Sequence, residues 1–331
     1  MKDKKARITA LGSYVPDRIL SNEELEKMVD TSDEWITTRT GIKERRLAGE
    51  NEHPSTMGAE AARRAIASAG LDPTELDLIL VATMTPDYIC PSTAALIQNL
   101  IGATRAAAVD FQAACSGFLY GLSMAKAYIE SGIYKNVLLI ATEKLSSFVD
   151  YTDRNTCILF GDGASAAIIC GEGVGLAIDY ISLGTDGAQA DIFQIPAGGA
   201  REPATAETIS AKRHYIQMQG REMYRHAVRR MEEETLLCLQ KMQMNIDQIK
   251  WLVPHQANIR IINTLREKIS FPEEKVYITL PKYGNTSASS VAIALDELHQ
   301  NHSLEEGEHL LLVAFGAGVT WAVTLLTKVS S

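Results

Sequence analysis

The residue best suited to nucleophilic chemistry is Cys115, in the stretch VDFQAACSGFLYGL from Val109 to Leu122. It stands where an apolar, strand-like run gives way to a helix-like run. The first turn of a helix presents unpaired N–H groups and partial positive charge, which stabilise a thiolate and lower the pKa of a cysteine there. A lone cysteine is more often a small buried hydrophobic residue, so Cys115 on its own favours that structural interpretation.

His255 and Asn285 add weight to the chemical interpretation. His255 follows Pro254 in WLVPHQANIRI, directly after a strand-like run, and strand ends are where α/β proteins place their sites. Asn285 lies beside a glycine in KYGNTSASS, a pattern that is also typical of a simple turn. The loop 316–318 (GAG) follows a core-like strand, and its backbone N–H groups can approach a ligand closely. Each signal is weak alone, so the prediction of a catalytic site depends on all of them together.

The elements that position these residues follow from apolar patterning. Short Val/Ile/Leu/Ala runs predict buried strands of a covered sheet at 76–84, 106–111, 137–142 and 310–315. Amphipathic patterns predict helices over 55–69 and 223–242, the longer with Leu236, Leu237 and Leu239 available to the core. Alternation of strands and helices indicates an α/β fold.

The two halves of the chain follow a similar order of elements. The first half reads AAAVDF (strand), QAACSG (turn), a helix, NVLLIAT (strand) and TCILFGDGASAAIIC (strand pair). The second reads KVYITL (strand), PKYGNTS (turn), a helix, HLLLVAF (strand) and GAGVTWAVTLL (glycine turn and strand). Either a duplication or a coincidence of α/β alternation explains this order. A duplication would make Cys115 and Asn285 equivalent and divide the chain into halves 1–173 and 174–331.

Composition excludes several classes of protein. The formal net charge of -9 argues against generic binding to nucleic acid or to a membrane surface. No apolar stretch is long enough to span a bilayer, and Pro16 and small polar residues interrupt the N-terminal run before a signal-peptide core forms. The five cysteines are scattered without a C-x-x-C pair, which argues against a disulfide framework and a zinc site and favours a reducing cytosol.

Long colinear motifs carry a resemblance to a known family. ACSGF, PHQANIRI, YGNTSASS and FGAGVTW, with SYVPDRILSNEELEKMVDTSDEWITTRTGIKERR near the start, closely resemble β-ketoacyl-acyl-carrier-protein synthase III, the condensing enzymes that initiate type II fatty-acid synthesis. The resemblance implies a thiolase-like fold, a duplicated five-layer αβαβα arrangement, usually as a homodimer. It also implies that Cys115, His255 and Asn285 are catalytic. Elongating condensing enzymes carry a second histidine in place of Asn285.

The implied mechanism is ping-pong and uses neither a metal nor a cofactor other than the coenzyme A thioester substrate. Cys115 attacks an acyl-CoA, and the resulting oxyanion is held by the backbone N–H groups of Cys115 and Ala317. Malonyl-acyl-carrier protein then loses carbon dioxide, and His255 and Asn285 stabilise the enolate as uncharged donors. Alanine at 317 replaces the frequent glycine and serves there unless its φ must be positive.

The resemblance assigns binding residues as well. Those for CoA are Trp35 and Arg154 around the adenine, Arg39 at the phosphates, and Asn258, Thr31 and Gly220 along the pantetheine arm. The acidic carrier protein would dock on Arg260, Arg225 and Lys268. Cys90 replaces a bulky aromatic residue of the dimer-contact loop that shapes the partner's acyl pocket, which leaves the primer acyl length open. The expected primer is a short acyl-CoA, acetyl-CoA first, and a roomier pocket would also admit longer or branched acyl groups unless neighbouring side chains fill it.

Three other functions remain as alternatives. A related thiolase-fold synthase with a different primer is the nearest. A cysteine hydrolase is another, since papain-like proteases also use Cys, His and Asn, although their cysteine signature is missing here. A non-catalytic scaffold of the same fold is the third, and the intact set of Cys115, His255 and Asn285 argues against it.

Overall fold

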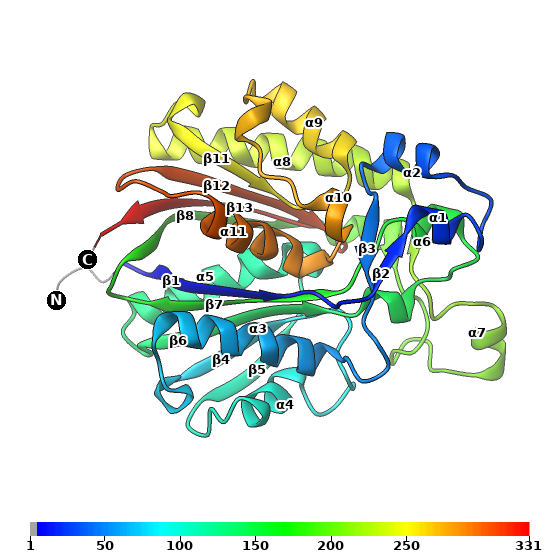
Figure 1. Cartoon of the computed structure of the whole chain (residues 1–331), viewed down its shortest axis with the longest axis horizontal. Coiled ribbons are helices and arrows are strands. Elements are labelled where there is room, and N and C mark those ends of the chain that lie inside the picture. Colours follow the sequence, from blue (N-terminus) through cyan, green and yellow to red (C-terminus); the bar gives the residue numbers. More distant parts are fainter. Residues whose placement is uncertain (1–4, 331) are drawn as a thin grey trace.

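The computed structural model describes residues 5–330, and in it helices and sheets alternate in five layers (Figure 1). One portion of the sheet separates the upper helices from the central pair, and the other separates the central pair from the lower helices. The expected arrangement of alternating helix and sheet layers is therefore confirmed. The helices are α8 (Gly220–Met242) and α9 (Ile259–Lys268) above, α5 (Gly117–Glu130) and α11 (Ser290–Asn301) in the centre, and α3 (Pro54–Ala69) and α4 (Thr93–Leu100) below.

Nine strands are hydrogen-bonded in the order β11-β12-β13-β8-β1-β7-β6-β4-β5. β1 joins β8 through only two residue pairs, Arg7 with Ala177 and Ile8 with Leu176, so the two portions separate and enclose the central helices. The strands are β1 (Arg7–Tyr14), β4 (Leu78–Ala82), β5 (Ala107–Phe111), β6 (Asn136–Glu143), β7 (Gly163–Cys170), β8 (Gly175–Thr185), β11 (Ile249–Pro254), β12 (His309–Gly316) and β13 (Thr320–Val329).

Strand pairing repeats between the two portions of the sheet. In the first portion β1, β7 and β6 pair antiparallel in turn, and β6, β4 and β5 pair parallel. In the second portion β8, β13 and β12 pair antiparallel, β12 and β11 pair parallel, and Leu252 of β11 forms a parallel bridge with Val276. The repeats meet at the turn between β7 and β8. We therefore propose that the chain divides there into halves 1–173 and 174–331.

The strand expected at KVYITL is reduced to the single bridge at Val276. The side-chain carbonyl of Gln256 explains this difference, because it accepts hydrogen bonds from the backbone N–H groups of Thr279 at 2.9 Å and Leu280 at 3.1 Å. Backbone donors that are bound in this way are not free to pair with a neighbouring strand. The strand predicted at the start of TCILFGDG is also wrong, because α6 (Arg154–Cys157), with Asp153 as its N-cap, ends within this stretch, and only Phe160 forms a bridge, with Asn285.

The repeat corrects the expected equivalence of Cys115 and Asn285. Short 3₁₀ turns precede both central helices, η2 (Ala114–Ser116) before α5 and η7 (Ser287–Ser289) before α11. Each opens on a residue with left-handed backbone, Ala114 at φ 45° and Ser287 at φ 51°. Matching these two residues makes Cys115 equivalent to Ala288, and Asn285 lies upstream in the loop before η7.

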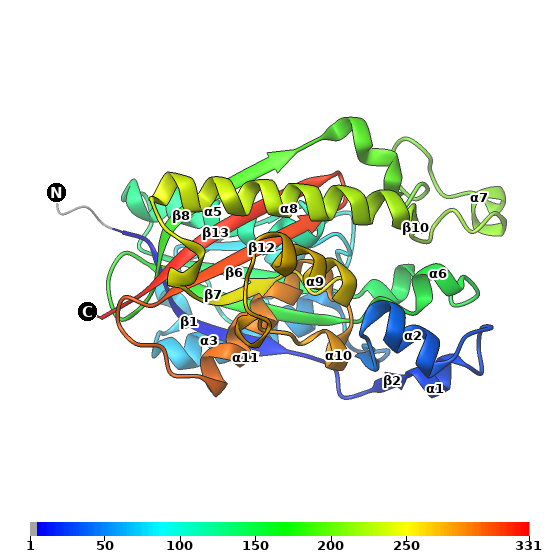
Figure 2. The same ribbon diagram turned by 90° about the horizontal axis from the view of Figure 1, so that it is seen from above.

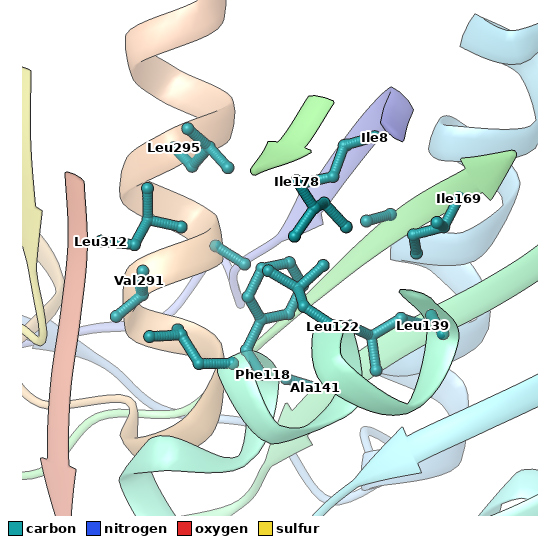
Figure 3. Close-up of a cluster of buried hydrophobic side chains, with 14 of the residues drawn as sticks. Ile8, Phe118, Leu122, Leu139, Ala141, Ile169, Ile178, Val291, Leu295 and Leu312 are labelled. Carbon is teal, nitrogen blue, oxygen red and sulfur yellow. The ribbon is translucent and has the colours of Figure 1, made fainter. Parts of the chain in front are cut away.

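The central helices are held by apolar packing against both portions of the sheet. Figure 3 shows Phe118 and Leu122 of α5 beside Val291 and Leu295 of α11, and these four side chains are fully buried. Burial of such a side chain stabilises the fold by about 1.5–3 kcal/mol. The packing fixes the N-terminal ends of both helices, which is where the segments carrying Cys115 and Asn285 enter.

Two burial predictions are wrong, although the predicted strands and helices around them exist. On α8 the side chains of Leu236 and Leu237 are exposed, and the buried stripe there runs through Met231, Cys238 and Leu239. β5 is an edge strand rather than a covered one, with Val109 46% exposed. Within residues 5–330, no helix is long and apolar enough to cross a membrane.

Candidate active site

A cavity of about 300 Å³ lies at the end of the layers where α2 (Asp33–Thr40) and α6 approach the first residues of α8 and α9 (Figure 2). Cys115, His255 and Asn285 all line it, and they are 8%, 4% and 7% exposed. Trp35, which is half-buried, and Arg39, which is exposed, also line the cavity, so it connects the core with the surface. Three distant parts of the sequence therefore meet at one buried place.

Cys115 lies in the tight turn between β5 and α5. Burial raises the pKa of its thiol to about 12, a hydrogen bond with Ser287 lowers the pKa, and the charge of Glu143 raises it. Burial thus outweighs any stabilisation of the thiolate by the start of the helix, and the predicted lowering of the Cys115 pKa is wrong. At neutral pH the thiol keeps its proton, so attack on a substrate requires a group that accepts this proton.

His255 follows β11 and is fixed by its backbone, whose N–H donates to the carbonyl of Val313 in β12 at 2.7 Å. Its Nδ1 lies 2.6 Å from Oγ of Ser290, at the start of α11. Burial lowers the pKa of His255 to about 3, so the ring is neutral at physiological pH. With Nδ1 engaged by Ser290, Nε2 is the ring nitrogen left to serve a ligand in the cavity.

Asn285 is held on both sides by backbone hydrogen bonds to the segment after α6. Its N–H donates to the carbonyl of Leu159 at 2.9 Å, and its carbonyl accepts from the N–H of Gly161 at 3.0 Å. Its side-chain Oδ1 accepts from the backbone N–H of Ser287 at 2.8 Å. Because Oδ1 is occupied, the amide presents its Nδ2 hydrogens as donors. Asn285 therefore forms the turn and also offers hydrogen-bond donors to a substrate.

The loop after β12 brings Ala317 beside Cys115. A Cβ added to Gly316 would lie 2.6 Å from the backbone nitrogen of Cys115, which shows how closely the two backbones approach. Ala317 lines the cavity, and it is not among the non-glycine residues with left-handed φ in the described part of the chain. An alanine therefore fits here without strain.

The predicted CoA residues separate into two groups. Trp35, Arg39, Gly220 and Asn258 line the cavity, whereas Thr31 and Arg154 do not. Arg154 still belongs to the same surface, because its guanidinium carbon lies 5.0 Å from the Trp35 ring centroid, and that of Arg39 lies 4.4 Å away. An adenine stacked between Trp35 and Arg154 would therefore have to separate the two side chains.

Thr31 and Asn258 differ in what they offer to a ligand. The hydroxyl of Thr31 is buried and has no hydrogen-bond partner in the described structure. Asn258 is the N-cap of α9, where its side-chain oxygen accepts from the N–H of Arg260 at 2.9 Å. Its side-chain amide N–H groups are therefore the part of Asn258 that a pantetheine chain would contact.

The predicted docking residues are exposed, but they are not equivalent. Arg260 lines the cavity and donates to the carbonyl of Thr38 at 3.3 Å. Arg225 pairs with Glu222 at 2.5 Å, and Lys268 pairs with Glu232 at 2.8 Å. Arg260 is therefore the residue of the three that lies at the cavity mouth.

The acyl pocket predicted from Cys90 is not formed within one chain. Cys90 is exposed in the loop between β4 and α4, and it lines neither the cavity that contains Cys115 nor the cavity lined by Tyr88 and Ile89. Its neighbours Tyr88 and Ile89 line a second cavity, which shares Ala317 with the first.

Sequence reasoning missed the apolar wall of the cavity and the polar residues behind the site. Methionines at helical spacing on α8 were the available signal for the wall. Glu143, Ser287 and Ser290 contact the site from behind. The two serines lie inside YGNTSASS, which was interpreted for Asn285 alone, and none of the motifs includes Glu143. The apolar wall includes Phe160, Phe193, Met218, Met223, Met231 and Phe315.

Known proteins match the chain over nearly its whole length. Sequence profiles described as 3-Oxoacyl-[acyl-carrier-protein (ACP)] synthase III and as its C terminal part match residues 109–187 and 239–328. A β-ketoacyl-[acyl-carrier-protein] synthase III of Chlamydia caviae is 55% identical over 329 residues, covering 99% of this chain and 98% of that protein.

Solved structures agree with these sequence matches. The crystal structure of 3-oxoacyl-[acyl-carrier-protein] synthase III from Aquifex aeolicus is 44% identical, covers 98% of this chain and 100% of that one, and has a TM-score of 0.89. The priming β-ketosynthase of the R1128 polyketide pathway is 35% identical, with coverages of 99% and 97% and a TM-score of 0.90. The chain, with its cysteine, histidine and asparagine around one cavity, belongs to the β-ketoacyl-[acyl-carrier-protein] synthase III family of acyltransferases.

Proposed function

We propose that the chain condenses a short acyl-CoA, acetyl-CoA in the first instance, with malonyl-acyl-carrier protein. The products are carbon dioxide, free CoA and a β-ketoacyl-acyl-carrier protein, which begins type II fatty-acid synthesis. The observation that supports this most is the meeting of Cys115, His255 and Asn285 in one buried cavity that reaches Trp35 and Arg39 at the surface.

In the first half-reaction the sulfur of Cys115 attacks the thioester carbonyl of the acyl-CoA. Negative charge develops on the carbonyl oxygen, and the backbone N–H groups of Cys115 and Ala317 donate hydrogen bonds to it. Donors that are already in place before the reaction are worth about 3 kcal/mol each in transition-state stabilisation. The CoA thiolate then leaves, and an acyl group remains on Cys115.

In the second half-reaction the charge appears elsewhere. Loss of carbon dioxide from the malonyl group leaves an enolate whose charge lies on its own thioester oxygen. Nε2–H of His255 and Nδ2–H of Asn285 donate to this oxygen. Burial keeps the imidazole neutral, so it donates a hydrogen bond without losing a proton. The carbanion then attacks the acyl group on Cys115.

Charge and shape support the binding roles. Trp35, between Arg39 and Arg154, suits an adenine ring with its phosphates, since a guanidinium pairs with phosphate and stacks on an aromatic face. A carrier protein that is acidic like this chain needs a local basic contact in order to dock. Arg260 at the cavity mouth is the first candidate, and Arg225 on α8 and Lys268 at the other end of α9 are further candidates.

The proposal includes a homodimer in the cytosol. Ile89 is 91% exposed next to the second cavity, and β5 presents an unpaired strand edge with Val109 half exposed. Exposed apolar groups and a free edge are suited to a second copy of the chain. In that dimer Cys90 would reach the acyl pocket of the partner. A cytosolic location is included because the reaction depends on a reduced Cys115 thiol.

Mass spectrometry tests this function directly. Incubation with acetyl-CoA should add one acetyl group to the peptide that carries Cys115, and Cys115→Ala should abolish the adduct. Asn285→Ala should keep the adduct and lose condensation with malonyl-acyl-carrier protein. Absence of any adduct from a series of short acyl-CoA substrates would overturn the ping-pong mechanism, and loss of acylation in folded Asn285→Ala would overturn the role of Asn285.

A further inference from the structure

Glu143 is a fully buried carboxyl group that the mechanism above does not use. It ends β6 and receives four donors: the backbone N–H of Met84 at 3.1 Å and the hydroxyls of Thr83 at 3.2 Å, Thr85 at 2.7 Å and Ser287 at 3.2 Å. An interior carboxyl with this many donors and no basic partner is a costly arrangement for a purely structural residue.

Charged groups near Glu143 do not compensate its charge. Burial raises the pKa of Glu143 to about 7, despite the hydrogen bonds that lower it. The group therefore changes protonation near neutral pH. In the described chain, the titratable groups of the elements packed against β6 are bound to other partners and do not pair with Glu143. Lys144 donates to the carbonyls of Gly49 and Glu52. The others are Asp87 with Ser55 and Thr93, Asp162 with Ser146 and Ala48, Glu60 with Arg63 and Arg64, Lys126 with Glu130, and Cys170 with Asn136.

Ser287 connects Glu143 to the nucleophile. Its Oγ lies 3.2 Å from Oε1 of Glu143, and its hydrogen bond also lowers the pKa of the Cys115 thiol. The backbone of Ser287 is fixed by a left-handed φ of 51° and by the bond from its N–H to Oδ1 of Asn285. A hydroxyl has one hydrogen and two lone pairs, so it can accept a proton from a thiol while it gives its own to a carboxylate.

We propose that Glu143 accepts the proton of Cys115 through the hydroxyl of Ser287. The S–H bond of Cys115 breaks as an O–H bond forms on Ser287, and the former O–H bond of Ser287 breaks as one forms on Oε1 of Glu143. The single negative charge moves from the carboxylate to the sulfur. The inference rests on the proposed function, in which this sulfur attacks an acyl-CoA.

The proton then stays on Glu143 while Cys115 carries the acyl group. The CoA thiolate that leaves takes a proton from water at the cavity mouth. When the carbanion attacks the acyl group, the tetrahedral intermediate expels Cys115 as a thiolate again. Ser287 then gives its proton to that thiolate while neutral Glu143 gives its own to Ser287, so the next cycle starts again from the Cys115 thiol and the Glu143 carboxylate.

His255 is a poorer acceptor for this proton. Its Nδ1 is engaged by Ser290 at 2.6 Å, and an imidazolium ion is disfavoured by burial, which lowers the pKa of the ring to about 3. Glu143 loses charge when it takes the proton, whereas His255 would gain charge in the same buried place. Desolvation therefore favours the carboxylate as the acceptor.

The pH dependence of Cys115 reactivity tests the inference. The rates to measure are alkylation of Cys115 by iodoacetamide and its acetylation by acetyl-CoA, both followed by mass spectrometry between pH 5.5 and 9. Wild-type rates should rise with pH near 7, as Glu143 ionises. Glu143→Gln and Ser287→Ala should each lose this rise and slow alkylation at pH 7.5 about 100-fold. The double variant should be no slower than either single variant.

A matched control separates this role from a structural one. Asp162 is also fully buried and receives hydrogen bonds from Ser146 and Ala48, with no contact to Cys115. Asp162→Asn should therefore lose stability and keep the rise near pH 7. If Ser287→Ala, which removes no charge, keeps the wild-type profile, the proton route is wrong. Wild-type protein that alkylates with this profile but never becomes acetylated would contradict the proposed function and leave the proton route standing.

Discussion

The Cα of Gly316 and the backbone N–H of Cys115 are so close that a single added methyl group would lie 2.6 Å from that nitrogen and 3.2 Å from the Cβ of Cys115. Gly316 closes β12 at the point where its loop turns toward Ala317. The approach places the backbone segments that carry the two donors of the proposed oxyanion hole, Cys115 and Ala317, next to each other. Glycine is required at this position for space, because its φ is not left-handed.

Gly316→Ala should therefore impair acylation more than folding. The added methyl group would displace the Cys115 backbone, with an overpacking cost of about 1–3 kcal/mol. Loss of one aligned donor should slow acetylation of Cys115 about 100-fold. Gly199→Ala is the matched control, since a Cβ there meets nothing within 4 Å. Thermal unfolding and the rate of adduct formation measure both effects. Equal rates of adduct formation in the two variants would refute the role of these backbone donors in acylation.

Stability should depend on pH through His255. Its pKa falls from 6.5 in the unfolded chain to about 3 in the fold, so the unfolded state binds more protons between these values. Stability is therefore present above pH 6.5 and lost as the pH falls. From pH 6.5 to 5 the loss from this group is about 2 kcal/mol. The free energies of unfolding of wild type and His255→Gln, measured in urea, should therefore approach each other as the pH falls from 6.5 to 5. A constant difference between the two proteins over this range would contradict the pKa shift of His255.

Ser290→Ala should affect the second half-reaction alone. The hydroxyl of Ser290 holds Nδ1 of His255 at 2.6 Å, and its loss frees the ring to rotate and to change tautomer. Condensation should slow about tenfold to 100-fold. Acetylation of Cys115 should continue at the wild-type rate. Separate single-turnover measurements of the two steps test this, and equal slowing of both steps would contradict the assignment.

Trp35→Leu should weaken the binding of CoA thioesters by losing the stacking surface beside Arg39 and Arg154. Base stacking on an aromatic ring is worth about 1–3 kcal/mol, so KM for acetyl-CoA should rise about tenfold. Acetyl-N-acetylcysteamine, which lacks the nucleotide, is the internal control, and its KM should be unchanged. A similar increase for both substrates would place Trp35 in the core rather than in the adenine site.

Cys90→Phe should shorten the preferred primer. The residue lies on an exposed loop beside Ile89, so its effect on the acyl pocket requires a second subunit. An aromatic side chain there would fill space that longer or branched acyl groups use. Relative kcat/KM for acyl-CoA chains of increasing length, together with sedimentation analysis, tests both points. A monomer with an unchanged chain-length profile would contradict the dimer proposal.

The sequence predicted the strands and helices well because each carries its own apolar pattern. β4 and α3 begin and end within about two residues of the predicted bounds. The strand at KVYITL could not be excluded from its pattern, because the side chain of Gln256 that binds its backbone donors comes from a distant loop. Likewise, nothing local shows that Val109 lies on a sheet edge.

The residues of the candidate site were largely predictable from the sequence, whereas their protonation was not. Cys115, His255, Asn285 and Ala317 were found from motifs, and the structure brings them together. Their protonation was not predictable, because the pKa of Cys115 is decided by burial rather than by the helix start that the sequence shows. Glu143 was missed for a similar reason, because its proposed role depends on a hydrogen bond with Ser287, which is distant in the sequence.

The equivalence of Cys115 and Ala288 means that only one of two equivalent turns in the chain carries a nucleophile. The internal repeat brings two similarly bent turns together, so closely that a Cβ added to Gly117 would lie 3.2 Å from the Cβ of Ala288. One turn carries a reactive sulfur and the other an inert methyl group. Because only one of the two turns carries a thiol, this junction holds one acyl group at a time.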